Sequence, residues 1–177
     1  MTTIIGIEDA NGCYLAADNQ TTVDNRAFYD PSMSKIRVLG DFLVAAAGSG
    51  LACDIVNHLW KPPAMKSLHT STYEFMIMDV VPAIKRAFET YGFPSSDSAD
   101  EVYAILIAFQ GHLFEIGSDG SVLCREDGIY GIGTGSTFAI GALEAGATIE
   151  EAMRIATSND IYTGGEIQIV RQEQPND

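Results

Sequence analysis

The sequence has little positive charge and no long hydrophobic run. Its 177 residues carry 10 Lys and Arg against 24 Asp and Glu, a formal net charge of −14. Because such a charge repels phosphate backbones and anionic lipid head groups, we expect neither nucleic acid nor a membrane as a partner. No apolar run approaches the roughly 18 residues that a membrane-spanning helix needs. The sequence therefore predicts a soluble protein with a single domain over residues 1–177, ending in a flexible tail at 172–177.

Cysteine is scarce, and no basic, hydrophobic leader is present. The three cysteines are far apart and form no CxxC or Cys/His ligand spacing: Cys13, Cys53 and Cys124. This pattern excludes a disulfide framework and a zinc site, and predicts buried free thiols in a reducing compartment. The first residues have no basic stretch and no long apolar stretch, unlike a secretory signal. We therefore expect a cytoplasmic protein.

Short apolar runs bounded by turn residues predict strands in the first quarter of the chain. Residues 3–7 and 13–18 flank Asn11-Gly12, a strong hairpin signal, and residues 36–39 and 42–47 flank Gly40-Asp41. These four strands would make one sheet. Apolar residues then recur at helical spacing over 51–60 and over 71–88, where Ser71 and Glu74 have capping-box spacing and Pro82 predicts a kink.

The second half of the chain repeats the order of strands followed by helices. Turn dipeptides separate strand-like runs at 102–109, 113–116, 122–124 and 129–132, which would form a second antiparallel sheet. Helices are predicted over 136–145 and from Thr148, followed by a last strand at 166–170. Segregated strands and helix pairs indicate an α+β domain, a four-layer αββα sandwich of two stacked sheets flanked by helix pairs. The strand–helix alternation of a Rossmann fold is absent.

Thr2 is a candidate nucleophile because it follows Met1 directly. Methionine is removed efficiently before small residues, and removal would expose the α-amine of Thr2. An α-amine has a pKa near about 8, so it can act as the general base for the hydroxyl of the same residue. Taken alone, Thr2 is more readily explained as an ordinary second residue.

Asp18 and Lys35 are candidates for a charge pair beside Thr2. Asp18 ends the second predicted strand and Lys35 begins the third, so strand pairing would bring both near the N-terminus. A Lys35 ammonium held there would lower the pKa of the Thr2 hydroxyl and of its α-amine. The alternative is a surface ion pair that contributes about 0 to 1 kcal/mol to stability.

A strand-to-helix junction supplies a candidate oxyanion donor. Ala46-Ala47-Gly48-Ser49-Gly50 lies where unpaired backbone N–H groups are available to stabilise negative charge, and the Gly48 N–H is the candidate. A lone Gly-x-Gly is a weak signal, and an ordinary glycine turn is the alternative.

Six motifs together resemble a known family. They are Thr2-Thr3-Ile4-Ile5-Gly6-Ile7, Leu15-Ala16-Ala17-Asp18, Ser34-Lys35-Ile36, Ala47-Gly48-Ser49-Gly50, Gly133-Thr134-Gly135-Ser136 and Asp160-Ile161-Tyr162-Thr163-Gly164-Gly165. Their order and spacing resemble those of proteasome β-type and HslV-like N-terminal nucleophile threonine peptidases over nearly the whole chain. The resemblance implies the N-terminal nucleophile hydrolase fold, with Met1 removed.

The resemblance also assigns roles to residues. Thr2 would be nucleophile and base, Asp18 and Lys35 its charge pair, and the Gly48 N–H the oxyanion donor. The polar groups around the α-amine would be Thr134, Asp160 and Thr163, with Thr at two positions where the family usually has Ser. The substrate-binding residues would be Ala46, Gly48, Gly50 and Asp54, with Ala46 leaving a roomy pocket and the Asp54 carboxylate favouring basic side chains.

Two departures from the family pattern concern backbone and spacing. The interval from Asp18 to Lys35 is one residue longer than usual, which implies an insertion or bulge near Asp30-Pro31. Ser49 stands where a second glycine is common.

The expected activity is threonine-type cleavage of peptide bonds in peptides or unfolded proteins. The resemblance implies a homo-oligomeric double ring of six- or seven-fold symmetry, fed by an ATP-driven unfoldase. No cofactor is required, although the family suggests a structural cation near the Asp160 to Thr163 turn. The histidines have no metal-binding or triad spacing and are interpreted as packing or surface residues: His58, His69 and His112.

Two other functions remain open. One is a catalytically silent ring scaffold that keeps Met1. With Met1 attached, the Thr2 nitrogen is an amide and cannot act as a base. The other is an amidase of the same fold that acts on small molecules.

Overall fold

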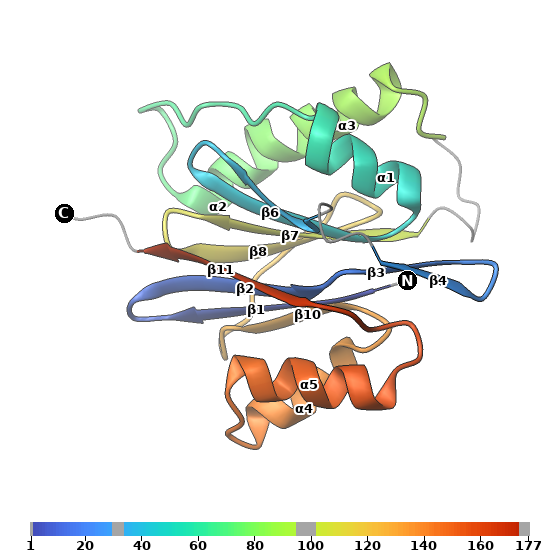
Figure 1. Cartoon of the computed structure of the whole chain (residues 1–177). Helices are drawn as coiled ribbons and strands as arrows, with labels where there is room; N and C mark the ends of the chain where they lie inside the picture. Colours follow the sequence, from blue (N-terminus) through green and yellow to red (C-terminus); the bar gives the residue numbers. More distant parts are fainter. Residues whose placement is uncertain (1, 30–33, 95–101, 174–177) are drawn as a thin grey trace.

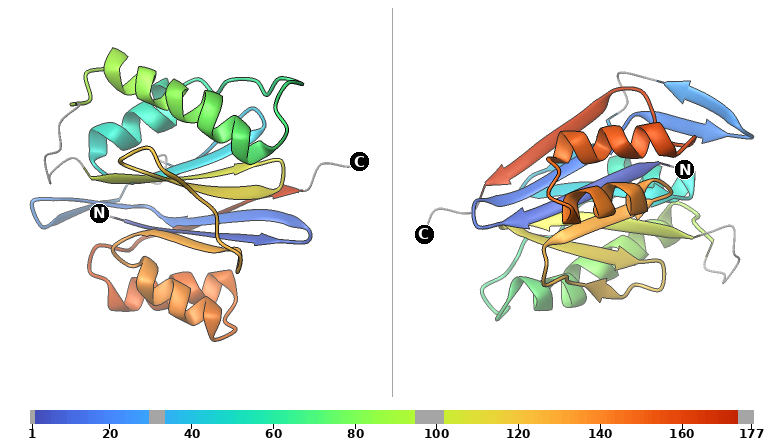
Figure 2. Two further views of the ribbon diagram at one scale, coloured as in Figure 1. Left: turned by 180° about the vertical axis from the view of Figure 1, so that it is seen from behind. Right: turned by 90° about the horizontal axis from the view of Figure 1, so that it is seen from below.

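A computed structural model describes residues 2–29, 34–94 and 102–173. Two antiparallel sheets lie face to face, and helices cover the outer face of each (Figure 1). This confirms the predicted four-layer αββα architecture. The left-hand view of Figure 2, seen from behind, shows the same layers, with α4 and α5 on one side and α1 to α3 on the other.

The first sheet contains the start and the end of the described chain. Its order is β10 (Ile129–Gly133), β1 (Thr3–Asp9), β2 (Gly12–Asp18) and β11 (Ile167–Glu173). The predicted hairpin between β1 and β2 is confirmed, with Asp9 paired to Gly12 across the turn. β1 also pairs with β10, and β2 pairs with β11, so Thr3 lies opposite Gly133 and Asp18 opposite Ile167.

The second sheet has the order β5 (Ile36–Leu39), β6 (Phe42–Gly48), β7 (Tyr103–Phe109), β8 (His112–Gly117) and β9 (Val122–Leu123). The predicted assignment of strands to sheets was therefore wrong in two places. β5 and β6 do not join β1 and β2, and β10 pairs with β1 instead of continuing the second sheet. The hydrophobic pattern identifies strands, but it does not say which strand edges meet.

A hairpin of β3 (Gln20–Val23) and β4 (Arg26–Tyr29) projects beside the N-terminal end of the first sheet (Figure 1). No strand was predicted between residues 18 and 36, so this hairpin was missed. Asp24 and Asn25 form its turn with φ of 48° and 61°. Asp and Asn tolerate these angles better than other non-glycine residues, so they favour such a turn. The signal for this hairpin in the sequence was the short run of β-branched residues directly before Asp24-Asn25.

The helical layer over the second sheet is less regular than predicted. The 51–60 helix is α1 (Gly50–Asp54) continued by a π-helical turn, η1 (Ile55–Leu59). The 71–88 helix is α2 (Thr72–Phe75), a second π-helical turn η2 (Met76–Val80) and α3 (Val81–Thr90). Pro82 has no N–H for an i to i−4 bond, and the π-helical turn η2 ends two residues before it, at Val80. Ser71 caps α2 by accepting from the Glu74 N–H at 3.1 Å.

The other helical layer follows the prediction closely. It contains α4 (Ser136–Glu144) and α5 (Ile149–Asn159). Thr148 and Glu151 form the predicted capping box: the Thr148 N–H donates to Glu151 Oε2 at 2.9 Å, and the Glu151 N–H donates to Thr148 Oγ1 at 3.2 Å.

Three apolar clusters fill the spaces between the layers. Along β6, Val44 packs toward the helices of the second sheet, while Ala45 faces the first sheet. The third cluster joins Ile5 and Ala16 of the first sheet to Met153 of α5. Burial on both faces explains why β6 is apolar at consecutive positions instead of alternating.

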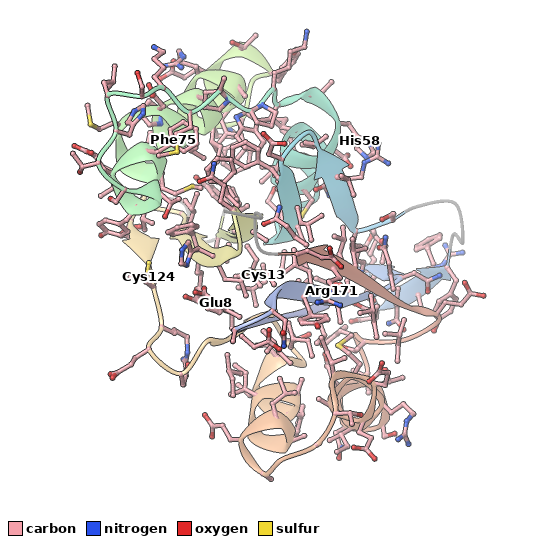
Figure 3. The ribbon with its side chains drawn as sticks, turned by 90° about the vertical axis from the view of Figure 1, so that its left-hand side faces the viewer. Glu8, Cys13, His58, Phe75, Cys124 and Arg171 are labelled. Atoms are coloured by element: carbon pink, nitrogen blue, oxygen red, sulfur yellow. The ribbon has the colours of Figure 1, made fainter. Side chains whose placement is uncertain are left out.

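The cysteines and the C-terminus differ from the prediction in part. All three cysteines are free, but only Cys13 is buried, whereas Cys53 is half-buried and Cys124 is exposed beyond β9 (Figure 3). The flexible tail predicted at 172–177 is wrong for its first two residues, because Gln172 and Glu173 still pair with β2; residues 174–177 lie outside the described part. Among the described residues, no helix is long and apolar enough to span a membrane.

Candidate active site

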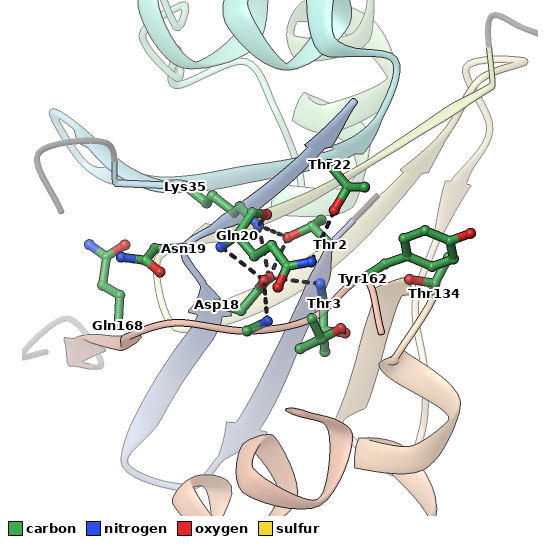
Figure 4. A network of polar contacts seen from close by, with 12 residues as sticks. Thr2, Thr3, Asp18, Asn19, Gln20, Thr22, Lys35, Thr134, Tyr162 and Gln168 are labelled. Carbon is green, nitrogen blue, oxygen red and sulfur yellow. Dashed lines mark hydrogen bonds and ion pairs between the residues drawn. The ribbon is translucent and has the colours of Figure 1, made fainter. Parts of the chain in front are cut away.

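Thr2, Asp18 and Lys35 lie together at the N-terminal end of β1 (Figure 4). The Thr2 hydroxyl donates to Asp18 Oδ1 and accepts a hydrogen bond from Lys35 Nζ. Lys35 Nζ also lies 2.8 Å from Asp18 Oδ1. The structure therefore brings together the three side chains that the sequence analysis grouped. The insertion expected near Asp30-Pro31 falls outside the described residues, and Met1 does too.

Asp18 is held by main-chain donors from three segments. Its Oδ1 accepts the Thr3 N–H at 2.9 Å, and its Oδ2 accepts the N–H groups of Gln20 and Gly164, each at 3.1 Å. The residue is 1% exposed. Because a buried carboxylate is costly without partners, these bonds fix both its position and the direction in which it meets Lys35.

Lys35 precedes β5 and reaches across from the second sheet to the first. Its ammonium donates to the main-chain oxygen of Gln20 at 2.5 Å as well as to Asp18. Burial lowers the pKa of Lys35, and the neighbouring Asp18 carboxylate offsets part of that effect. A partly dehydrated ammonium in contact with a hydroxyl favours loss of the hydroxyl proton.

A second polar group lies behind Thr2 and Thr3. Asp160 Oδ2 accepts from the hydroxyls of Thr134 and Thr163, both at 2.6 Å, and Thr163 Oγ1 lies 2.6 Å from Thr3 Oγ1. The Thr134 N–H donates to the Thr2 carbonyl at 2.9 Å. Burial alone would raise the pKa of Asp160, but the donors from Thr134, Thr163 and the Tyr162 N–H outweigh it and lower the pKa below its ordinary value. This group holds the backbone around Thr2.

The turn does not offer a carboxylate-rich metal site. Asp160 already accepts three hydrogen bonds through its side chain. Within the described ranges, no group of three or more His, Cys, Asp or Glu side chains could hold a metal ion. A cation near the Asp160 to Thr163 turn would therefore rely on main-chain and hydroxyl oxygens.

A cavity of about 620 Å³ opens beside Thr2. All four predicted substrate-binding residues line it: Ala46, Gly48, Gly50 and Asp54. Residues of the β3–β4 hairpin, of α1 and of η1 that were not predicted from the sequence also line it: Thr22, Tyr29, Cys53, Asn57 and His58. His58 is therefore a cavity residue, whereas His69 and His112 pair with Asp79 and Glu8 at 2.8 Å and 2.9 Å.

Gly48 is held in a backbone conformation that favours glycine. Its φ is +109°, and a Cβ atom there would lie 2.2 Å from the Val102 carbonyl oxygen. Because no side chain fits, the main chain of the junction approaches the cavity directly beside Thr2.

The architecture is the N-terminal nucleophile hydrolase fold. Solved structures of two known proteins share it over nearly the whole chain. BPH of Thiobacillus denitrificans superposes with a TM-score of 0.77 at 21% identity, covering 99% of this chain and 100% of that one. HslV from Trypanosoma brucei superposes with a TM-score of 0.65 at 24% identity, covering 97% and 99%. A second structure of the Thiobacillus protein, in complex with epoxomicin, gives a TM-score of 0.77 at 20% identity, covering 98% and 100%.

Sequence comparison assigns the family. The family model described as proteasome subunit matches residues 1–171, so this chain belongs to the proteasome subunit family. The ATP-dependent protease subunit HslV of Trypanosoma brucei brucei is 28% identical over 173 residues, which cover 92% of this chain and 78% of that protein. The predicted resemblance to proteasome β-type and HslV-like proteins is confirmed.

Proposed function

We propose that this chain is a threonine-type peptidase with Thr2 as nucleophile and base. One observation carries the proposal: the Thr2 hydroxyl contacts both Lys35 Nζ and Asp18 Oδ1, beside a cavity large enough for part of a peptide. Membership of the proteasome subunit family and the name of the HslV relative support a peptidase over other amide hydrolases.

The chemistry starts when Met1 is removed and the α-amine of Thr2 becomes free. The amine takes the hydroxyl proton as Oγ1 attacks the scissile carbonyl, and the ammonium of Lys35 stabilises the developing alkoxide. The Gly48 N–H stabilises the oxyanion. Proton return from the amine releases the new N-terminus and leaves an ester on Thr2. Water activated by the same amine then hydrolyses the ester and restores the hydroxyl.

The cavity defines where the peptide binds. Ala46 and Gly50 leave space near Thr2, and the Asp54 carboxylate on the cavity wall favours a basic side chain at the cleaved bond. The hydroxyls of Thr134 and Thr163 and the Asp160 carboxylate orient the backbone around the α-amine.

We also propose that the chain forms a homo-oligomeric double ring of six- or seven-fold symmetry in the cytoplasm. The HslV relative is called an ATP-dependent protease subunit, which supports an ATP-driven unfoldase as partner. Light scattering after size exclusion tests the ring, and a monomer would contradict it.

An epoxyketone such as epoxomicin tests the nucleophile, because it reacts with both the hydroxyl and the amine of an N-terminal threonine. We expect the intact mass of the untagged protein to show loss of Met1 and one adduct per subunit. The Thr2→Ala variant is the matched control, since alanine still permits methionine removal but supplies no hydroxyl. A full-length mass without adduct would favour the silent scaffold. An adduct with turnover of small amides but not of peptides would favour the amidase.

A further inference from the structure

Gln20 is the first residue of β3 and lies beside Asp18 and Lys35, with its side chain reaching toward Thr22 (Figure 4). It is 3% exposed. A glutamine side chain is expensive to bury unless both ends of its amide are bonded. Here both ends are bonded, and the partners come from two separate segments of the chain.

The amide of Gln20 joins the hairpin to the loop after α5. Its Oε1 accepts from the Tyr29 hydroxyl at 2.9 Å. Its Nε2 donates to Thr22 Oγ1 at 3.0 Å and to the Ile161 carbonyl at 2.9 Å. Thr22 and Tyr29 line the cavity, whereas Ile161 follows Asp160 directly.

Gly164 shows how closely this loop packs on the amide. A Cβ at Gly164 would lie 2.4 Å from Gln20 Oε1, so a larger residue would displace the glutamine. The same glycine donates its N–H to Asp18 Oδ2 at 3.1 Å. The loop therefore contacts the Gln20 side chain and the candidate catalytic carboxylate at once.

The main chain of Gln20 contacts the charge pair directly. Its N–H donates to Asp18 Oδ2 at 3.1 Å, and its carbonyl oxygen accepts from Lys35 Nζ at 2.5 Å. This carbonyl is the third partner of the Lys35 ammonium, after Thr2 and Asp18. Any shift of β3 along the hairpin would therefore move it away from Lys35. The side-chain amide is what fixes β3 against Ile161 and Tyr29.

We infer that Gln20 is a positioning residue, which holds Lys35 in register with Thr2 by anchoring the cavity-lining hairpin to the 160–164 loop. The inference rests on the proposed function, because it assigns Gln20 a part in the same reaction. The Gln20 amide touches no reacting atom and acts through its own main-chain carbonyl on Lys35.

The test compares Gln20→Ala with Gln172→Ala. Gln172 is a matched control because its amide also ties main-chain groups, donating to the Asp41 carbonyl at 2.7 Å and accepting from the Gly111 N–H at 3.2 Å. It lies at the far end of β11, opposite Cys13 instead of Asp18.

Two readouts separate positioning from folding. The first is the rate of epoxyketone adduct formation, which we expect to fall about 10-fold in Gln20→Ala, because small misplacements of catalytic groups are costly. The second is the pKa of Lys35, measured by competitive acetylation and peptide mass spectrometry. We expect the pKa of Lys35 to rise toward its ordinary value as water reaches the ammonium. The charged and titratable neighbours of this ammonium are Asp18 of β2 and Cys53 of α1. Gln172→Ala should change neither readout.

Tyr29→Phe is the milder variant if Gln20→Ala fails to fold. It removes the Tyr29 hydroxyl that donates to the Gln20 amide oxygen. The adduct rate should fall about 2- to 3-fold, and the pKa of Lys35 should rise less than in Gln20→Ala. Unchanged readouts in folded Gln20→Ala, or equal losses in Gln172→Ala, would overturn the inference. Absence of an adduct in the unmodified protein would overturn the proposed function instead, and acetylation of Lys35 would still report on Gln20.

Discussion

Lys35 Nζ and Asp18 Oδ1 are 2.8 Å apart, although the two residues belong to different sheets. Asp18 ends β2 of the first sheet, and Lys35 precedes β5 of the second. The Asp18 side chain is 0% exposed and the Lys35 side chain is 15% exposed. The surface ion pair considered from sequence is therefore wrong: this pair is buried at the edge of the sandwich, in contact with the Thr2 hydroxyl.

Replacing Lys35 should affect activity and stability together. Lys35→Met keeps the apolar stem but leaves the Asp18 carboxylate without its cation, so we expect peptide hydrolysis to fall about 10²- to 10³-fold. The free energy of unfolding should decrease by about 3 kcal/mol, since removing one partner of a buried pair is costly. Urea denaturation and a peptidase assay measure the two effects. Lys85→Met on α3 is the control, and equal behaviour of the two variants would contradict the role of Lys35.

Two glycines of one junction should respond differently to alanine. Gly48→Ala places a Cβ 2.2 Å from the Val102 carbonyl at a φ of +109°, so we expect a loss of stability of about 1–3 kcal/mol or more. Gly50→Ala meets open space at the start of α1 and should be neutral or stabilising by up to about 1 kcal/mol. Thermal unfolding of both variants checks the difference, and similar melting temperatures would refute it.

The hydroxyl of Thr134 should matter more at neutral than at acid pH. Hydrogen bonds hold the pKa of Asp160 below its ordinary value, so the stability that this carboxylate contributes is present above about pH 4 and is lost as pH falls through its native pKa. Thr134→Val removes one donor and should lower the free energy of unfolding by about 1.5 kcal/mol at pH 7. The difference from the unmodified protein should shrink at pH 3. Thr134→Ser keeps the donor and should resemble the parent at both pH values.

Cys13 should make the protein sensitive to alkaline pH. Burial, with smaller effects of the Glu8 and Asp9 carboxylates, raises the pKa of Cys13 to about 12. Its contribution to stability is therefore complete below about pH 8.5, the ordinary thiol pKa, and is lost as pH rises toward 12. Cys13→Ala should reduce the slope of unfolding free energy against pH by about 1.4 kcal/mol per unit in this range. The exposed Cys124 is the control, and an equal change in Cys124→Ala would exclude burial as the cause.

Local structure followed from the sequence where the determinants are neighbours in the chain. The hairpin around Asn11, the capping box of Thr148 with Glu151, and the capping of α2 by Ser71 each depend on residues within a few positions of one another. The two-faced burial of β6 was visible in its continuous apolar run. The grouping of Thr2, Asp18 and Lys35 also came from the sequence, through motifs that resemble a family.

The tertiary structure decided what depends on distant pairing. β10 and β11 join the first sheet across more than a hundred residues, and no local pattern specifies which strand edges meet. That pairing brings Gly133 opposite Thr3 and brings Gly164 to Asp18. Gln20 is polar and follows a strand, so the sequence presents it as a loop residue. Packing between the hairpin and the 160–164 loop gives its amide partners, and Lys35, which precedes a strand of the second sheet, meets its carbonyl.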